Sequence, residues 1–256
     1  MARPGIGAWR DKVSWLPAWT KAEFGILIAL MVIGGTGYAI LELASEIGEG
    51  ETHAFDRAIL LAFRNPGDLA DPIGPWWFEQ MMKDITSLGS TAVLTLITVG
   101  ALGYLLIERK YHAALFLLIA IGGGTLLSTL LKMGFDRPRP DLVAHGAEVH
   151  SASFPSGHAL MSAVTYLTLG ALLARVQPRR RLKLYFLAVA VVLAILVGVS
   201  RVYLGVHWPT DVLAGWCLGS AWALSCWLIA IWMQGRGEME GEEVLSSSRP
   251  SGVGPG

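Results

Sequence analysis

The sequence predicts an all-α polytopic membrane protein with six transmembrane helices and an interfacial helix in the first outer connection. Hydrophobic residues make up 53% of its 256 residues and charged residues only 16%, which departs clearly from the composition of soluble globular domains. Six long stretches also contain no Asp, Glu, Lys or Arg, and a helix needs roughly 20 apolar residues to cross the hydrocarbon core. A soluble all-α protein with buried helices is the alternative that these observations disfavour.

The six predicted spans lie at residues 24–41, 87–107, 113–131, 158–174, 184–200 and 212–234. Gly122, Gly123 and Gly124 in the third span are small enough to let neighbouring helices approach closely. Cys217 and Cys226 both fall in the sixth span. We interpret them as small buried hydrophobes and not as a disulfide or a metal-binding pair.

Three regions follow from this pattern. Residues 1–23 form a cytoplasmic N-terminal segment, and the apolar run after it is too long for the core of a signal peptide, so we expect a retained membrane anchor. Residues 24–234 form the six-span membrane domain. Residues 235–256 are rich in Gly, Ser, Pro and Glu and contain few large apolar residues, which predicts a disordered cytoplasmic tail.

Basic residues near the span ends predict the orientation, because cytoplasmic loops carry an excess of Lys and Arg. They gather at 109–110, between the second and third spans, and at 175–183, between the fourth and fifth. Both termini of this inner-membrane protein are then cytoplasmic, and the first, third and fifth connections face the periplasmic or extracellular side. The first connection agrees with an outward location through its acidic residues: Glu42, Glu46, Glu49, Glu51 and Asp56.

The first outer connection, residues 52–86, contains its own amphipathic pattern. The stretch HAFDRAILLAFR has apolar residues at helical spacing, and the aromatic residues Trp76, Trp77 and Phe78 follow it. We interpret this as an interfacial helix with an aromatic anchor at the depth of the lipid headgroups. Ordinary packing over the end of the helical bundle is an equal alternative.

Three polar clusters interrupt the apolar pattern, at residues 132–140 (KMGFDRPRP), 155–158 (PSGH) and 200–211 (SRVYLGVHWPTD). Ionisable residues at membrane depth are costly and usually functional. The predicted topology places the first two clusters in the third connection and the last in the fifth, so all three face outward. We therefore expect them to form one site.

The clusters contain the groups that bind an anion. Lys132, Arg139 and Arg201 supply positive charge, and arginine presents a planar fork that suits phosphate oxygens. Ser156 and Gly157 stand where a helix is predicted to begin, so their N–H groups are unpaired and glycine lets an oxyanion come close. These residues predict a phosphate-binding pocket.

The same clusters contain an acid and a nucleophile. His158 would touch the bound anion and could protonate a leaving oxygen. His207 and Asp211 are four residues apart around Pro209, so the carboxylate can hold one imidazole nitrogen and leave the other free to attack. Each motif alone is more typical of a helix cap or a turn. The combination is what indicates catalysis.

The three clusters together resemble the signatures of the type 2 phosphatidic acid phosphatase superfamily, also called lipid phosphate phosphatases, which shares its site with vanadium-dependent haloperoxidases. The resemblance covers roughly residues 24–234, and the undecaprenyl-diphosphate phosphatases of bacteria are similar. Order and spacing both agree: Lys132, six residues, Arg139 and Pro140; then Pro155, Ser156, Gly157 and His158; then Ser200 and Arg201, five residues, His207, three residues and Asp211.

The resemblance implies a mechanism. His207 would attack phosphorus to form a phosphohistidine, Asp211 would orient it, and His158 would protonate the departing group. Water would then release phosphate without a metal ion or another cofactor. The phosphoryl oxygens would be held by Lys132, Arg139, Ser156, Gly157 and Arg201.

The remaining polar and aromatic residues of these regions have simpler interpretations. Arg137 lacks the family's spacing from Lys132, so we expect it to contact a headgroup or loop. His53 and His112 are interpreted as interfacial, Trp208 and Trp216 as packing residues. Near the second cluster, three residues lack the spacing of a metal site, and no metal is assigned to them: His145, Glu148 and His150.

The predicted function is hydrolysis of a lipid phosphate or diphosphate taken from the outer leaflet, with undecaprenyl diphosphate as the first candidate substrate. Phosphatidic acid and phosphatidylglycerophosphate are the alternatives, and a haloperoxidase is the other enzyme class. A membrane transporter or anion-binding scaffold remains a different class, although the two halves of the chain show no internal repeat. Lys plus Arg and Asp plus Glu both total 20, so net charge gives no indication of a nucleic-acid partner.

Overall fold

The computed structural model describes residues 18–141 and 152–235. Most of the predicted N-terminal segment and of the tail, residues 1–17 and 236–256, lie outside the described residues, so their predicted roles stay predictions. The same holds for His145, Glu148 and His150 in the third connection.

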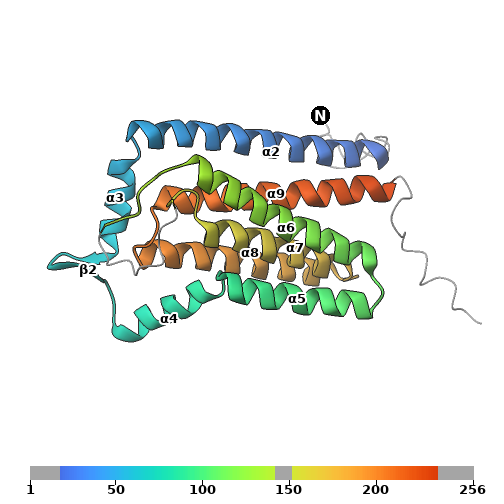
Figure 1. The fold of residues 1–256 in the computed structure, drawn as a ribbon. Helices are drawn as coiled ribbons and strands as arrows, with labels where there is room; N and C mark the ends of the chain where they lie inside the picture. Colours follow the sequence, from blue (N-terminus) through green and yellow to red (C-terminus); the bar gives the residue numbers. More distant parts are fainter. Residues whose placement is uncertain (1–17, 142–151, 236–256) are drawn as a thin grey trace, which may run out of the picture.

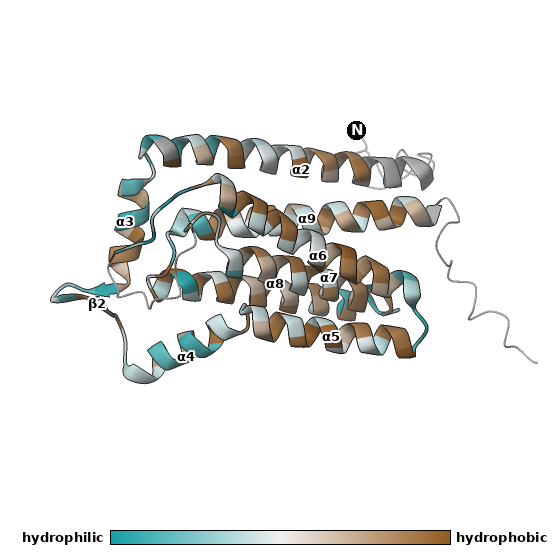
Figure 2. Cartoon of the chain, in the orientation of Figure 1, coloured by the Kyte–Doolittle hydropathy of each residue, from teal (hydrophilic) through white to brown (hydrophobic). Residues whose placement is uncertain are grey.

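Long helices run side by side and form the body of the molecule, and shorter elements cover one end (Figure 1). Figure 2 shows that the long helices are predominantly hydrophobic and that hydrophilic residues concentrate at their ends. The long helices are α2 (Ala18–Glu49), α5 (Thr91–Ile107), α6 (Tyr111–Gly134), α7 (Gly157–Arg175), α8 (Arg180–Tyr203) and α9 (Pro209–Gly235).

The predicted all-α polytopic fold is confirmed. Among the described residues, five helices are long and apolar enough to cross a membrane. Helix α5 alone is short and passes the same test only together with α4 (Trp76–Ser87), from which it is bent by 49°, so six crossings require that this pair counts as one broken span. The sequence places this span at 87–107 and does not predict the helix that precedes it.

The first helix is longer than predicted. α2 continues to Glu49, and its apolar stretch runs to Ile47, beyond the end of the predicted span at residue 41. Glu42, Glu46 and Glu49 therefore belong to the helix, and their assignment to a loop is wrong. Glutamate is a good helix former, and nothing stops the helix before Gly50, whose positive φ of 80° ends it.

The outer connection contains the predicted helix and an unpredicted hairpin. Helix α3 (His53–Ala62) precedes an antiparallel pair of short strands, β1 (Arg64–Asn65) and β2 (Asp68–Pro72). Leu60 of α3 is completely buried and packs on α7, α8 and α9, as the packing alternative requires. Trp76 and Trp77 at the start of α4 are 75% and 60% exposed, so they are free to act as the predicted anchor.

Glycine contacts bring α9 and α6 close to their neighbours. A Cβ on Gly215 would lie 2.8 Å from Ser156 O, and one on Gly219 would lie 2.5 Å from Leu160 O. Neither position could hold a larger residue without a backbone shift, so the start of α7 is fixed against α9. Gly123 packs under Trp222 and Gly124 against Val164, whereas Gly122 faces open space.

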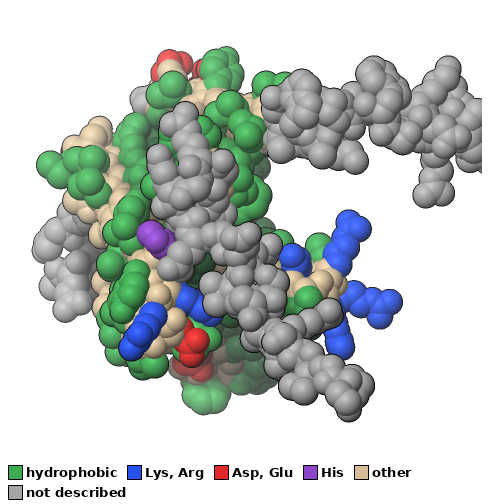
Figure 3. Space-filling view, turned by 90° about the vertical axis from the view of Figure 1, so that its right-hand side faces the viewer, with side chains coloured by type: hydrophobic (Ala, Val, Ile, Leu, Met, Phe, Trp, Pro, Cys, Tyr) green, Lys and Arg blue, Asp and Glu red, His purple; other side chains and the backbone are tan. Residues whose placement is uncertain are grey.

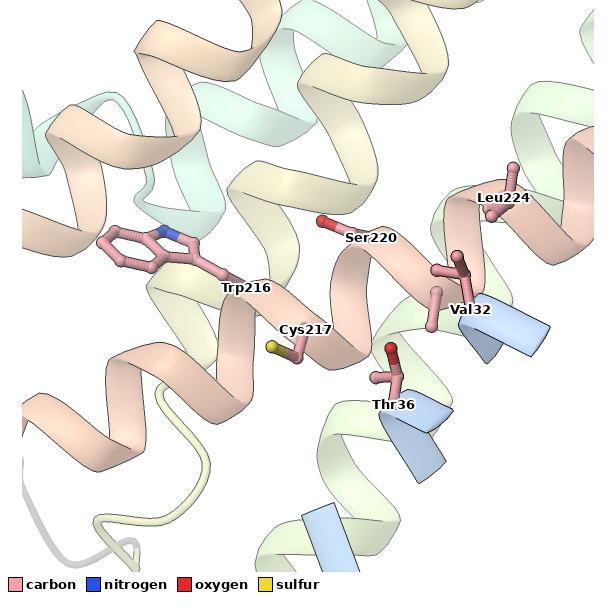
Figure 4. A pocket seen from close by; sticks show the side chains of 7 residues that line it. Val32, Thr36, Trp216, Cys217, Ser220 and Leu224 are labelled. Carbon is pink, nitrogen blue, oxygen red and sulfur yellow. The ribbon is translucent and has the colours of Figure 1, made fainter. Parts of the chain in front are cut away.

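Helix α2 covers α9 on one side and leaves a hollow of about 240 Å³ between the two helices (Figure 4). Cys217 is exposed and lines this hollow, whereas Cys226 is buried, and both thiols are free. The prediction of two buried cysteines is therefore correct only for Cys226. Trp216 packs as expected, since its indole nitrogen donates to Ala194 O of α8 at 2.9 Å. The hollow is lined by Val32, Thr36, Trp216, Cys217, Ser220, Ala221 and Leu224.

Candidate active site

The three polar clusters come together at the end of the bundle that α3 and the hairpin cover. The first cluster touches the second, because a Cβ on Gly157 would lie 3.3 Å from Lys132 Nζ. It also touches the third, because Arg139 Nη1 lies 3.2 Å from His207 Nε2. The helix ends of α6, α7, α8 and α9 therefore build a single site, as the predicted topology requires.

His207 is buried, with 1% of its surface exposed. Arg139 approaches its Nε2, and a guanidinium can only donate hydrogen bonds, so this nitrogen must be the unprotonated one. Its Nδ1 faces Ser153 Oγ at 3.4 Å and Asp211 Oδ2 at 3.5 Å. The neutral imidazole thus carries its proton toward Asp211 and its lone pair toward the cationic side of the site.

Asp211 lies in the first turn of α9, after the predicted Pro209 start. Its Oδ2 accepts hydrogen bonds from Ser153 Oγ at 2.5 Å and from the backbone N–H of Trp208 at 2.9 Å. Its Oδ1 accepts from Arg137 Nη1 at 2.6 Å. Ser153 lies just before the second cluster, and no sequence pattern singled it out.

The expectation that Arg137 contacts a headgroup or loop is wrong. Its guanidinium is buried and bridges two carboxylates, since Nη1 lies 2.6 Å from Asp211 Oδ1 and Nη2 lies 2.6 Å from Asp56 Oδ2. Asp56 is also completely buried and does not form part of an acidic surface loop. Thr210 joins the same network, because its N–H and its hydroxyl both donate to Asp56, at 2.9 and 2.7 Å.

Helix α7 begins where the sequence predicts, but the expectation that the N–H of Ser156 is unpaired is wrong. Ser156 is the N-cap, and its Oγ accepts from the N–H of Ala159 at 3.5 Å. The N–H of Ser156 itself donates to Asp211 O at 3.0 Å, so it is not available to a ligand. Gly157 begins the helix next to Lys132 Nζ, and the first N–H groups of a helix have no intrahelical partner. The positive end of α7 therefore adds to the charge of the lysine.

The bend between α4 and α5 forms a wall of the site that the sequence did not reveal. Arg201 Nη1 donates to Thr86 Oγ1 at 3.2 Å, and the buried Arg201 Nε has no hydrogen-bond partner among the described residues. Gly89 lies against Val197 and against His158, whose Cδ2 would be 3.3 Å from an added Cβ. A side chain at Gly89 would clash with Val197 and crowd His158. The sequence signal for this contact is only a glycine between Leu88 and Ser90.

Two ionisable groups of the site lie outside the spans, and burial lowers the pKa of both. Burial lowers the pKa of His207 to about 4, while its hydrogen bond to Asp211 acts in the opposite direction. Burial also lowers the pKa of Arg139, and the charge of Asp211 opposes that change. Since arginine starts from so high a pKa, Arg139 stays cationic while His207 is neutral at neutral pH. The site therefore combines a neutral imidazole with positively charged neighbours.

The other residues that the sequence singled out lie outside this centre. The ring of His53 stacks on Trp208 with 6.2 Å between centroids, and the indole nitrogen of Trp208 donates to Pro138 O at 2.9 Å. His112 is exposed in the first turn of α6, at the opposite end. In residues 18–141 and 152–235, no three His, Cys, Asp or Glu side chains are close enough to hold a metal ion.

The fold and the site define a helical membrane protein with a buried His–Asp pair beside a cluster of cationic side chains. Its residues 113–234 match the model of the PAP2 superfamily. The chain is 39% identical over 146 residues to phosphatidylglycerophosphatase B of Bacillus subtilis, which covers 56% of this chain and 70% of that protein. It is 47% identical over 68 residues to an undecaprenyl-diphosphatase of Sulfolobus acidocaldarius, covering 27% and 29% of the two chains.

A solved structure agrees with these relatives. The transmembrane PAP2-type phosphatidylglycerolphosphate phosphatase of B. subtilis has 31% sequence identity and a TM-score of 0.70, covering 80% of this chain and 97% of that chain. The chain therefore belongs to the PAP2 superfamily, as the signatures indicated. It is a multi-pass membrane enzyme of the lipid phosphate hydrolase class.

Proposed function

We propose that the protein removes phosphate from a membrane lipid through a phosphohistidine formed on His207. The observation that carries this proposal is the orientation of the buried imidazole. Its unprotonated Nε2 faces Arg139, and its Nδ1 faces Asp211. A neutral imidazole held in this way is a nucleophile aimed at a place where phosphoryl oxygens would be bound.

In the first step, the Nε2 lone pair forms a bond to phosphorus and the bond from phosphorus to the lipid oxygen breaks. Arg139 then donates to the phosphoryl oxygens in place of Nε2. Lys132 and Arg201 bind the same oxygens. The N–H of Gly157 at the start of α7 adds a further donor. Ser156 acts by capping this helix, since its own N–H is bonded to Asp211 O.

Proton transfers complete the cycle. His158 donates a proton to the departing lipid oxygen and then accepts one from the water that attacks the phosphohistidine. Asp211 stabilises the positive charge that the imidazole gains while it carries the phosphoryl group. The second step releases inorganic phosphate and regenerates His207. Cations of the protein supply the charge stabilisation, so the proposed mechanism uses no metal ion.

The ionisation of His207 can be measured directly. An ordinary histidine is half protonated near pH 6.5, whereas burial lowers the pKa of His207 to about 4. The nucleophile should therefore stay neutral from pH 8 down to about pH 5 and be lost only as the pH falls through about 4. ¹⁵N NMR of histidine-labelled protein in detergent, assigned with His207→Gln, would show this. A doubly protonated His207 ring at pH 6 would contradict the proposal.

The relatives support two candidate substrates. The B. subtilis phosphatidylglycerophosphatase B matches over the larger part of both chains, which favours phosphatidylglycerophosphate. The shorter match to the undecaprenyl-diphosphatase favours the polyprenyl diphosphate first expected from the sequence. Both lipids place a phosphoryl group at the level of the headgroups. The exposed Trp76 and Trp77 lie at the same end of the bundle as the site, which supports a site at that level.

The test of the proposed function compares substrates in one detergent. Phosphate release as kcat/KM would be measured for phosphatidylglycerophosphate, polyprenyl diphosphate, phosphatidic acid and glucose phosphate, with and without EDTA. We expect both candidate lipids to exceed the soluble ester, because each buried methylene of the tail contributes about 0.8 kcal/mol to binding. EDTA should leave the rates unchanged. Higher efficiency on glucose phosphate than on every lipid, or strict metal dependence, would contradict the proposal.

We also propose that the site faces the outside of the cell and takes its lipid from the outer leaflet. The N-terminal end of α2 and the C-terminal end of α9 then face the cytoplasm. The distribution of basic residues supports this orientation. At the end of the bundle opposite to the site, Lys and Arg side chains project from the surface (Figure 3). Those exposed at this end are Arg109, Lys110, Arg175, Arg179, Arg180, Arg181 and Lys183.

Cysteine labelling tests the orientation. Single cysteines would replace Gly67 in the hairpin turn, where a side chain meets no neighbour within 4 Å, or the exposed Pro178 between α7 and α8. The background would carry Cys217→Ala and Cys226→Ala. An impermeant thiol reagent added to spheroplasts should label the cysteine at 67 and reach the one at 178 only after lysis. The reverse pattern would place the active site in the cytoplasm.

A further inference from the structure

The hydrogen-bond network behind the His–Asp pair reaches beyond the three signature clusters to α3. Arg137 Nη1 binds Asp211 Oδ1 and its Nη2 binds Asp56 Oδ2, each at 2.6 Å. Thr210 connects the same groups, because its hydroxyl accepts from Arg137 at 2.8 Å and donates to Asp56 at 2.7 Å. Thr52, at the N-terminus of α3, accepts a longer bond from Arg137 at 3.3 Å. The outer helix α3 is thus joined through Arg137 to Asp211, the partner of His207.

The charges of this network do not cancel. Asp56 and Asp211 are both completely buried, and Arg137 is 7% exposed. By themselves these three buried side chains carry a net charge of −1, and the nearby cation Arg139 lies on the opposite side of the His207 ring. Arg137 therefore cannot fully neutralise Asp211, because Asp56 shares its guanidinium. In a low-dielectric interior a charge imbalance of this kind acts strongly on a neighbouring imidazole.

We propose that Asp56 is a positioning residue that holds Arg137 in place and keeps Asp211 an effective anion toward His207. Asp211 then favours the positive charge that develops on the imidazole as it attacks phosphorus. This inference rests on the proposed function, since it assigns Asp56 a part in the reaction of His207. A purely structural role is the alternative, because Asp56 also accepts the N–H of Thr210 at the start of α9.

Three variants separate charge from structure. Asp56→Asn keeps the size of the side chain and leaves Arg137 and Asp211 with a net charge of zero. The double variant Asp56→Asn/Arg137→Gln removes one charge of each sign and restores the net charge of −1. Asp84→Asn, at an exposed position of α4 on the same end of the molecule, is the matched control. Each variant would be checked for monodispersity and thermal unfolding in detergent before kcat and KM are measured on phosphatidylglycerophosphate.

We expect Asp56→Asn to lower kcat on the order of tenfold or more, the size that partners of ligating and catalytic groups commonly show. KM should change less than about twofold, because the phosphate-binding residues are untouched. The double variant should recover at least about a third of the lost rate on a logarithmic scale. Asp84→Asn should behave as wild type. A folded double variant that is no more active than Asp56→Asn would overturn the proposal.

Failure to fold is also informative. If Asp56→Asn cannot be purified, the double variant carries the test, because Asp211 still accepts from Ser153 and Trp208. It should fold and keep kcat within about tenfold of wild type. Loss of folding, or of a hundredfold in kcat, would assign the network to structure alone. Failure of the proposed function would appear elsewhere, as a wild type without lipid phosphatase activity or an active His207→Ala variant.

Discussion

Replacing His207 by alanine should reduce phosphate release by about 10⁴-fold or more while the protein stays folded in the membrane. The reason is that Nε2 supplies the electron pair for the bond to phosphorus, and no other described side chain at the site presents a free imidazole nitrogen beside both Asp211 and Arg139. The measurement is steady-state phosphate release from phosphatidylglycerophosphate and from polyprenyl diphosphate, at equal amounts of purified protein.

The matched control is His112→Ala, at an exposed position at the opposite end of the bundle. It should leave the rate unchanged. Removal of the buried imidazole ring leaves a small cavity, so thermal unfolding of His207→Ala would be recorded in parallel. Near-normal turnover in a folded His207→Ala variant would show that another residue is the nucleophile. Loss of activity in His112→Ala would show that the assay reports stability instead of chemistry.

Replacing Arg139 by methionine should lower kcat/KM by about 10²- to 10³-fold, the usual cost of losing a donor that stabilises developing negative charge. Arg139 contacts the nucleophile itself, with its Nη1 at 3.2 Å from Nε2 of His207. Its second function is to fix the loop, since the same Nη1 donates to Val206 O at 2.9 Å. Methionine keeps the length of the stem and removes every donor.

Two further measurements make the Arg139 result specific. Arg57→Met, at an exposed position of α3, should leave kcat/KM unchanged. Inhibition of Arg139→Met by inorganic phosphate should weaken in parallel with catalysis, because the same guanidinium binds the oxygens of substrate and product. A loss smaller than threefold, or unchanged inhibition by phosphate, would remove Arg139 from the phosphate pocket.

Local sequence patterns were sufficient for the parts of this molecule that depend on neighbouring residues. Apolar length predicts helices across the membrane because an unpaired backbone is too costly in hydrocarbon, and six crossings follow once α4 and α5 are taken as one broken span. Pro209 and Asp211 predict the first turn of α9, and Ser156 predicts the cap of α7. The spacing of the signature residues indicated the PAP2 superfamily, which the relatives confirm.

Other features depend on contacts that no local pattern contains. Asp56 precedes Arg137 by 81 residues and Thr210 by 154, and only the packing of α3 over the bundle brings them together. From the sequence, Asp56 was therefore interpreted as an acidic residue of the outer loop and Arg137 as a contact of a headgroup or loop. Gly89 likewise can be recognised as a neighbour of the site only from the structure, because the bend between α4 and α5 places it against His158.

The sequence by itself determined the class of fold and the approximate spans, because these follow from hydropathy. It also predicted the residues of a phosphate pocket, from short spacings at helix ends and from the family resemblance. Only the tertiary structure showed which side chains hold Asp211, the partner of His207, in place. A buried charge is stable only where partners from distant segments satisfy it, and those partners are selected by how the helices pack. This is why Lys132, Arg139 and His207 could be proposed as site residues from the sequence, whereas Asp56, Arg137 and Ser153 could not.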